Sequence, residues 1–319
     1  MADRRQPGYI YLSHTFLHGL VVDEYFVFVV SERRVTTETK PTMGIIGTLE
    51  SISEQFEWER TDVKAKITLL VFLFFCAVYV LSTFISPVIL TYKNLRMKEK
   101  IFWNLAIVRG VYGFFCIFMG TWAIFIDTEL VKDVVFATTP LSNLAMSTTV
   151  GFFLFEVAMI TWSDIYYRQF NFLLNLHHWI SLIGYAVILY IGSSHYFGTR
   201  GLILEMSTPF SCLCWTLLKA DLAHSKLWKI NQYVLVHAFH LRSVMECSVW
   251  YVTYIHWERI WSAMPMLMFC ILYTQLFLVT FVMTPYWTYK KTAQMINPVD
   301  WNFEDSNKHK MENGSLKSE

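Results

Sequence analysis

The sequence has 319 residues, of which 55% are hydrophobic, 17% aromatic and only 16% charged, and its formal net charge is +1. Soluble domains carry about 25% charged residues, so this composition excludes an ordinary soluble protein and favours a polytopic membrane protein. A net charge this close to zero gives no global field to attract DNA or RNA, so we expect no nucleic-acid partner.

Residues 1–57 differ in kind from the rest of the chain. Charges are scattered through them, and their longest apolar stretch, 16–30, is interrupted by Asp23 and Glu24. Such a stretch is too short and too charged to cross a bilayer. We therefore expect an N-terminal extension that is poorly ordered or lies on a surface.

Seven apolar segments follow, at 67–90, 102–126, 147–163, 171–191, 199–219, 231–252 and 264–288. Each is about long enough to cross a bilayer as a helix, and no soluble domain separates them. The sequence therefore predicts an all-α polytopic membrane protein with about seven transmembrane helices in one bundle, at 58–291, followed by a cytosolic tail at 292–319. Pro209 should kink the fifth segment.

Lysine and arginine concentrate in the short loops after the first, third, fifth and seventh segments. Cytosolic loops carry such an excess, so we place these loops in the cytosol. The N-terminus is then lumenal and the C-terminus cytosolic.

The cysteines all lie inside apolar runs, where neither a disulfide framework nor a zinc site is expected, and we interpret them as packing residues with no metal bound. They are Cys76, Cys116, Cys212, Cys214, Cys247 and Cys270.

Ionisable side chains from four segments fall at one depth. At 1.5 Å per residue they lie ~9–14 Å from the cytosolic end of their segments. They are Arg109, Glu156, the adjacent pair His177 and His178, and the pair His237 and His240. Ionisable groups inside a membrane are costly and tend to mark sites, although an Arg109–Glu156 ion pair and histidines that join helices by hydrogen bonds would be a structural alternative.

Two further acids and one base lie outside this layer. Glu205 falls in the lumenal half, beside the Pro209 kink, and is either a cavity carboxylate or a protonated side chain bonded to freed backbone. Arg242 and Glu246 are four residues apart on one predicted helix and can pair with each other.

A layer of this kind suits acyl transfer. A neutral imidazole can act as a general base or carry an acyl group, a carboxylate can orient it, and an arginine can meet a phosphate or an oxyanion. We therefore predict catalytic roles for His177, His178 and Glu156. The predicted substrate-binding residues are Arg109, His237, His240, Glu205 and Arg242.

Several strings then give a family resemblance. They are "EKIFW" at 99–103, "LLNLHHW" at 173–179, "LEMSTPF" at 204–210, "HAFHLR" at 237–242, and the run from "PYWTYKKT" to "NPVDWNF" that ends at Phe303. With them, the region from about Trp58 to Phe303 resembles the TLC superfamily of TRAM, Lag and ceroid-lipofuscinosis proteins, and most of all its ceroid-lipofuscinosis branch.

The resemblance implies a protein of the endoplasmic-reticulum membrane that cycles through the ER–Golgi intermediate compartment and acts in lipid homeostasis and lysosome function. In the ceramide-synthase branch the histidine pair is catalytic and acyl-CoA is the co-substrate, and His177 and His178 match that pair. In ceramide synthases the histidine pair is followed downstream by a His-Asp dipeptide and a further aspartate. In the corresponding region of this sequence Glu205 is the only acid. The acceptor can therefore be phospholipid-type or sphingoid.

Two functions remain open from the sequence. The first is a lipid acyltransferase whose partners are membrane lipids. The second is a non-enzymatic cargo receptor that carries newly made lysosomal hydrolases from the endoplasmic reticulum to the Golgi with coat proteins. Assembly into a homo-oligomer is compatible with either function.

The predicted orientation can be tested at the sequon Asn313-Gly314-Ser315. A cytosolic tail never meets the glycosylation machinery, so Asn313 should carry no glycan. A mass shift that glycosidase removes, and that Asn313→Gln abolishes, would reverse the orientation.

Overall fold

The computed structural model describes residues 44–168, 170–300 and 303, which belong to one compact unit, Thr42–Glu319. The regular secondary structure of these residues is helical. In chain order the elements are α2 (Ile45–Ser53), α3 (Thr61–Ile85), η1 (Ser86–Val88), α4 (Leu90–Asn94), α5 (Met97–Phe125), α6 (Pro140–Tyr167), α7 (Phe172–Ile191), α8 (His195–Gly201), η2 (Leu202–Ser207), α9 (Thr208–Lys219), α10 (Lys226–Ile255), α11 (Trp257–Ala263), α12 (Met266–Leu278), η3 (Val279–Met283) and α13 (Thr284–Ile296).

All seven predicted segments are helical, and the all-α membrane fold is confirmed. Within the described residues, six helices are long and apolar enough to cross a membrane: Thr61–Val88, Met97–Phe125, Pro140–Tyr167, Phe172–Ile191, His195–Lys219 and Met266–Ile296. The remaining segment, α10, is long enough, but it carries the charges of Lys226, Lys229, Arg242 and Glu246 together with several other polar residues.

The fifth segment is interrupted, as its proline predicts. Leu202–Ser207 form a 3₁₀ helix between α8 and α9, and Pro209 stands in the first turn of α9. A 3₁₀ turn has a rise of about 2 Å per residue and exposes a different face from an α-helix, so this break re-aims the side chains next to it.

Two described segments flank the bundle helices. In the predicted N-terminal extension, Ile45–Ser53 form α2, and the Trp58 indole donates a hydrogen bond of 2.7 Å to the carbonyl oxygen of Ser53. Residues 1–43 lie outside the described residues. At the other end α13 continues to Ile296, and Phe303 packs on Phe102 and Trp215.

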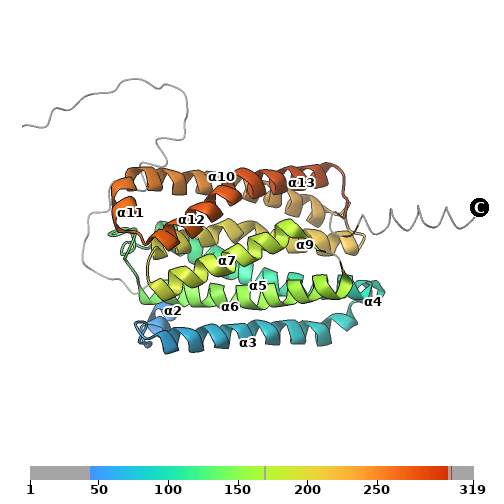
Figure 1. Cartoon of the computed structure of the whole chain (residues 1–319). Helices are drawn as coiled ribbons and strands as arrows, with labels where there is room; N and C mark the ends of the chain where they lie inside the picture. The colour runs from blue at the N-terminus through green and yellow to red at the C-terminus, as the bar shows by residue number, and fades with distance from the viewer. Residues whose placement is uncertain (1–43, 169, 301–302, 304–319) are drawn as a thin grey trace, which may run out of the picture. The chain divides into compact units, whose positions relative to one another are not determined.

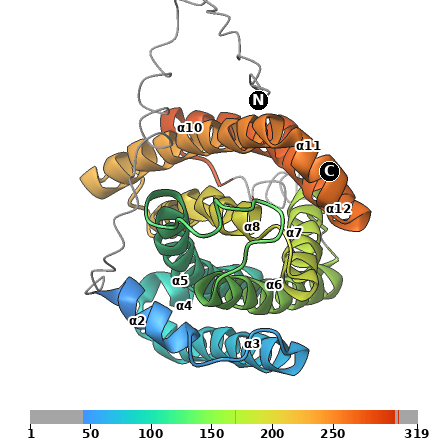
Figure 2. The ribbon, with the colours of Figure 1, turned by 90° about the vertical axis from the view of Figure 1, so that its left-hand side faces the viewer.

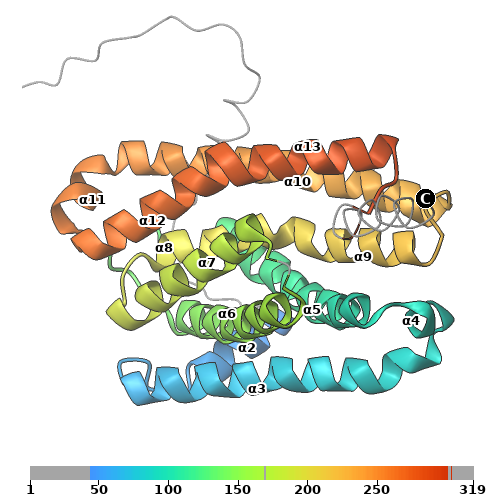
Figure 3. The same cartoon turned by 45° about the vertical axis from the view of Figure 1, so that its right-hand side comes forward.

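The helices stand side by side with α5 in a central position. Figure 1 shows α3 along one edge and α10 with α13 along the opposite edge, and α5, α6, α7 and α9 lie between them. Viewed end-on in Figure 2, α10, α11 and α12 arch over a ring of α5, α6, α7 and α8. Figure 3 shows α12 passing into α13 alongside α10. The site described below lies where α7, η2, α10 and α12 meet.

Helix α5 approaches the broken segment closely because a glycine stands at the contact. A Cβ atom added at Gly120 would lie 2.7 Å from the backbone nitrogen of Ile203 and 2.8 Å from its Cα. Small residues of this kind let helix backbones pack closely in membrane proteins. The contact fixes η2, and therefore Glu205, against α5.

This contact gives a test of the packing. Gly120→Ala should destabilise the protein by about 1–3 kcal/mol, because backbone atoms would have to move to admit the methyl group. Gly110→Ala on the same helix is the matched control, since a Cβ there meets nothing within 4 Å. Thermal unfolding of both variants in detergent should show a loss only for Gly120→Ala. Equal midpoints would contradict the close approach.

Candidate functional site

Helix α7 presents the two adjacent histidines to different neighbours. Asn171 caps the N-terminus of the helix, and its side chain accepts a hydrogen bond of 3.2 Å from the backbone nitrogen of Leu174. His177 and His178 are both buried, and their ring centroids lie 5.1 Å apart with an angle of 63° between the ring planes. Consecutive residues on a helix point about 100° apart, so the pair reaches into two distinct polar centres.

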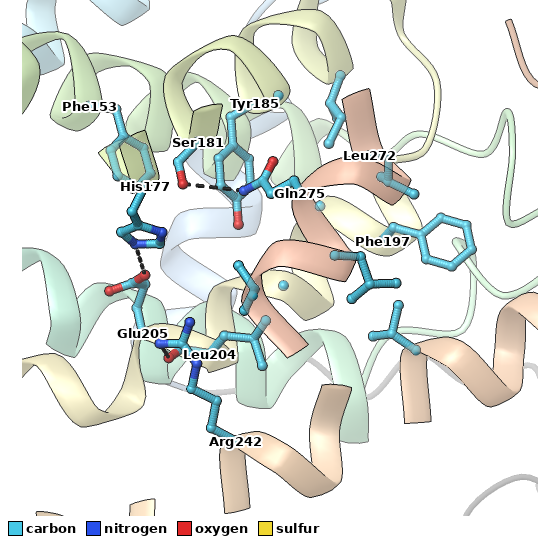
Figure 4. A pocket seen from close by; sticks show the side chains of 17 residues that line it. Phe153, His177, Ser181, Tyr185, Phe197, Leu204, Glu205, Arg242, Leu272 and Gln275 are labelled. Carbon is cyan, nitrogen blue, oxygen red and sulfur yellow. Dashed lines mark hydrogen bonds and ion pairs between the residues drawn. The ribbon is translucent and has the colours of Figure 1, made fainter. Parts of the chain in front are cut away.

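The first centre joins His177 to η2. The Nε2 atom of His177 lies 3.6 Å from Oε1 of Glu205, as Figure 4 shows. The other carboxylate oxygen of Glu205 accepts a hydrogen bond of 2.6 Å from the Thr208 hydroxyl. The Trp287 ring packs edge-on against the imidazole at 5.3 Å. These contacts fix one ring edge of His177.

The second centre joins His178 to a buried ion pair. Glu156 of α6 is fully buried, and its Oε1 accepts a hydrogen bond of 2.6 Å from Nε of Arg109 of α5. Nε2 of His178 lies 3.9 Å from the same oxygen. The Arg109 guanidinium also lies over the ring of Phe102 at 5.2 Å. This centre ties three helices together and leaves Nδ1 of His178 buried without a hydrogen-bond partner in the described part of the chain.

Arg242 of α10 extends the first centre. Its Nε donates a hydrogen bond of 3.1 Å to Glu246, as the i,i+4 spacing predicts, and its Nη1 donates one of 3.0 Å to the Leu204 carbonyl. Glu246 also accepts a hydrogen bond of 2.6 Å from the Thr284 hydroxyl of α13. Arg242 is therefore held beside Glu205 through the backbone of η2.

A cavity of about 90 Å³ begins at the first centre. His177, Glu205 and Arg242 line it, whereas the residues of the second centre do not. Roughly 10–15 Å³ is enough for one water molecule, so the cavity has room for several small groups. Its remaining lining is mostly apolar and comprises Phe153, Ser181, Gly184, Tyr185, Ile188, Phe197, Gly198, Gly201, Leu204, Val249, Leu272, Gln275, Leu276 and Val279.

His237 and His240, which the sequence placed at the depth of Arg109, Glu156 and His178, do not join these residues in the structure. His237 and His240 are exposed on α10, and His237 lies 2.8 Å from the backbone oxygen of Tyr233 through its Nδ1. Counting residues along a helix fixes depth but not the direction of a side chain. The buried stripe of α10 runs through Arg242 and Glu246, so His237 and His240 lie on other faces of the helix.

The predicted depth of Glu205 was also wrong. The sequence placed it in the other half of the bilayer from His177, yet the two side chains are in contact. The helical structure of this segment begins at His195, four residues earlier than predicted, and then passes through a 3₁₀ turn with a larger rise per residue. Both effects carry Glu205 further across the bundle.

Gln275 is the cavity residue that the sequence did not single out. Its amide nitrogen donates a hydrogen bond of 3.2 Å to the hydroxyl of Ser181, one turn from His177 on α7. The sequence signal that could have identified Gln275 is its amide side chain, which stands within the apolar run of α12. No group of three metal-ligating side chains occurs among the residues that the structure describes.

Comparisons with known proteins agree on one family. The TLC domain matches residues 102–292. The chain is 38% identical to Protein CLN8 of Canis lupus familiaris over 261 residues, which are 81% of this chain and 90% of the relative. It is 35% identical to Protein CLN8 of Homo sapiens over 259 residues, with the same shares.

A more distant match reaches TLC domain-containing protein 4 of Homo sapiens, at 26% identity over 145 residues, 45% of this chain and 52% of that protein. No solved structure matches the chain. The domain match covers more than half of the chain and contains both histidines and their carboxylate partners. The chain is therefore a polytopic membrane protein that belongs to the TLC-domain family.

Proposed function

We propose that this protein is a lipid acyltransferase of the endoplasmic-reticulum membrane, with acyl-CoA as the donor and His177 as the general base. The observation that carries the proposal is the contact of His177 with Glu205 at the polar end of a largely apolar cavity. A carboxylate beside one ring nitrogen orients an imidazole and stabilises its protonated form, and the other nitrogen is then placed to accept a proton.

The residues support a balanced transfer step. Nδ1 of His177 accepts the proton of an acceptor hydroxyl or amine, and the acceptor atom forms a bond to the thioester carbonyl carbon. The carbon–sulfur bond breaks, and the departing thiolate of coenzyme A takes the proton back from His177. Glu205 offsets the positive charge that the imidazole carries between these two proton transfers. The acceptor is a phospholipid-type or sphingoid lipid.

His178 has a different role in this proposal. It is held at the Arg109–Glu156 pair and does not line the cavity. We assign His178, Glu156 and Arg109 to positioning α7 against α5 and α6, so that His177 faces the cavity.

The two roles predict different losses. His177→Ala should lower acyl transfer by ~10²–10⁴-fold, as expected for a general base, with little change in thermal stability. His178→Ala should lose mainly stability, by ~0.6–2 kcal/mol. His237→Ala is the matched control, because this histidine was predicted at the same depth but is exposed, and it should change neither property.

The assay is acyl transfer from acyl-CoA by the purified protein to lysophospholipid, glycerophosphodiester and sphingoid acceptors, with unfolding measured on the same preparations. If well-folded His177→Ala transferred acyl groups as fast as the wild type, His177 would not be the general base. If wild-type protein transferred no acyl group to any acceptor, a cargo receptor for lysosomal enzymes would become the leading function.

The positioning role of the buried pair has its own test. Arg109→Met leaves the Glu156 carboxylate buried without its cation and should cost about 3–5 kcal/mol of stability. The double variant Arg109→Met/Glu156→Met removes both charges and should recover most of that loss. Thermal unfolding of the single and double variants measures the difference. A double variant as unstable as the single variant would show that the pair is not what holds α5 to α6.

A further inference from the structure

Helix α10 carries a regular stripe of side chains on the face that points away from the bundle. The members of the stripe follow one another at alternating intervals of three and four residues, and all of them are exposed: Ile230, Tyr233, His237, His240, Val244, Cys247, Tyr251 and Tyr254. Arg242 and Glu246, which reach the interior, lie on another face of the same helix. The alternation of three and four residues is the a and d spacing of a coiled coil. We call these eight residues the α10 seam.

The α10 seam is long enough to cross the membrane. It contains an a and a d position in each of four successive heptads, and a repeat sustained over about three or four heptads is typical of a coiled coil. At 1.5 Å per residue, Ile230 and Tyr254 are about 36 Å apart along the helix, and a hydrocarbon core is ~30 Å thick. A partner helix can therefore follow the seam through the whole bilayer.

The exposed polar groups of the α10 seam distinguish this edge of the bundle from the opposite one. Figure 1 shows α3 along one edge and α10 along the other. From Leu69 to Ile85 every exposed residue of α3 is apolar, which suits contact with lipid. The α10 seam instead exposes the imidazoles of His237 and His240 and the side chains of three tyrosines. Polar groups within a bilayer are costly unless another polar group meets them, so this face suits a protein partner better than lipid.

The two histidines give the α10 seam both a hydrogen-bond donor and an acceptor. Nδ1 of His237 lies 2.8 Å from the backbone oxygen of Tyr233, and a carbonyl oxygen can only accept, so Nδ1 carries the hydrogen. Nε2 of a neutral His237 is then an acceptor. The ring of His240 lies one turn further on, with its centroid 6.4 Å away, and a neutral imidazole always carries one N–H donor. A face with a donor and an acceptor one turn apart is complementary to itself.

From the spacing and the hydrogen-bonding groups together, we propose that the α10 seam is the interface of a homodimer, with α10 of a second copy packed along it. Both copies insert into the membrane with the same orientation, so the two-fold axis between them lies along the membrane normal and the two helices run parallel. Equal residues then face each other at equal depth. The N–H of each copy's His240 can donate to Nε2 of the other copy's His237, which gives two symmetric hydrogen bonds across the seam.

The proposed interface is separate from the cavity. Arg242 and Val249 line the cavity from the inner side of α10, whereas no residue of the α10 seam lines it. The inference therefore does not depend on the proposed acyl transfer. A second copy is the partner that matches the seam at every level, because it brings the same spacing and the same histidines at the same depth.

Cys247 is a natural probe of the interface because it stands within the α10 seam. A parallel dimer brings the two Cys247 residues together, and a disulfide can form where Cα atoms are about 4.4–6.8 Å apart. Oxidation of native membranes with copper phenanthroline and dissolved oxygen should therefore link the full-length protein into a dimer, and Cys247→Ser should abolish the link. Cys270 of α12 is the matched control, because it is also exposed but lies outside the seam. Cys270→Ser should cross-link as the wild type does.

A second pair of variants tests the packing of the seam. Val244→Trp places a large side chain in the layer next to Cys247 and should lower cross-linking at Cys247 by about tenfold or more, as expected for an overpacked contact. Leu69→Trp places the same side chain on the lipid-facing surface of α3, where Leu69 is 56% exposed, and should leave cross-linking unchanged. Both variants should stay folded in thermal unfolding, because both side chains point away from the rest of the bundle. Equal cross-linking of the two variants would contradict a packed seam.

Purified protein in liposomes identifies the partner. The Cys247 link should form in phosphatidylcholine liposomes that contain only this protein, and it should survive dilution with excess lipid. If the link formed in native membranes but not in these liposomes, the seam would bind another membrane protein and the homodimer would be wrong. If Leu69→Cys in a Cys247→Ser background linked as efficiently as Cys247 does, the link would report random collision, and the seam would face lipid.

Discussion

A carboxylate buried among apolar helices needs a cation or a hydrogen-bond donor beside it, because its desolvation is otherwise uncompensated. Glu156 obtains this partner from Arg109 of α5, Glu205 from His177 of α7 and Thr208, and Glu246 from Arg242 and from Thr284 of α13. Three of these pairings join separate helices: Arg109–Glu156, His177–Glu205 and Thr284–Glu246. The need to pair these acids therefore sets which helices meet at the centre of the bundle.

This pairing also gives the adjacent residues His177 and His178 different carboxylate partners. His178 is directed to an acid whose charge Arg109 already balances, whereas His177 is directed to Glu205, beside which Arg242 is held through the Leu204 carbonyl. The difference arises from the helical rotation between consecutive residues. It places His177 at the cavity and His178 at the Arg109–Glu156 pair.

The sequence was sufficient for properties that depend on composition and on distance along a helix. Apolar length located all seven helices, and shared depth identified Arg109 with Glu156. It was insufficient for properties that depend on rotation about a helix axis or on irregular turns. His237 lies at a suitable depth but on an exposed face, and the early start of α8 with the 3₁₀ turn after it displaced Glu205 from its predicted level. Both errors concern packing, which residue spacing alone does not specify.

The irregular turns have a common position in the bundle. Glu205 stands on the 3₁₀ turn η2, and across the cavity α12 continues into the π-helical turn Val279–Met283, whose first residue also lines the cavity. Such turns have poorer hydrogen-bond geometry than an α-helix and often occur at functional sites. Regular α-helices from His195 to Lys219 and from Met266 to Ile296 would rotate the residues beyond each turn to other faces. The 3₁₀ turn carries Glu205 to His177, and the π-helical turn begins at a residue that lines the same cavity, so this site is built where the helices are least regular.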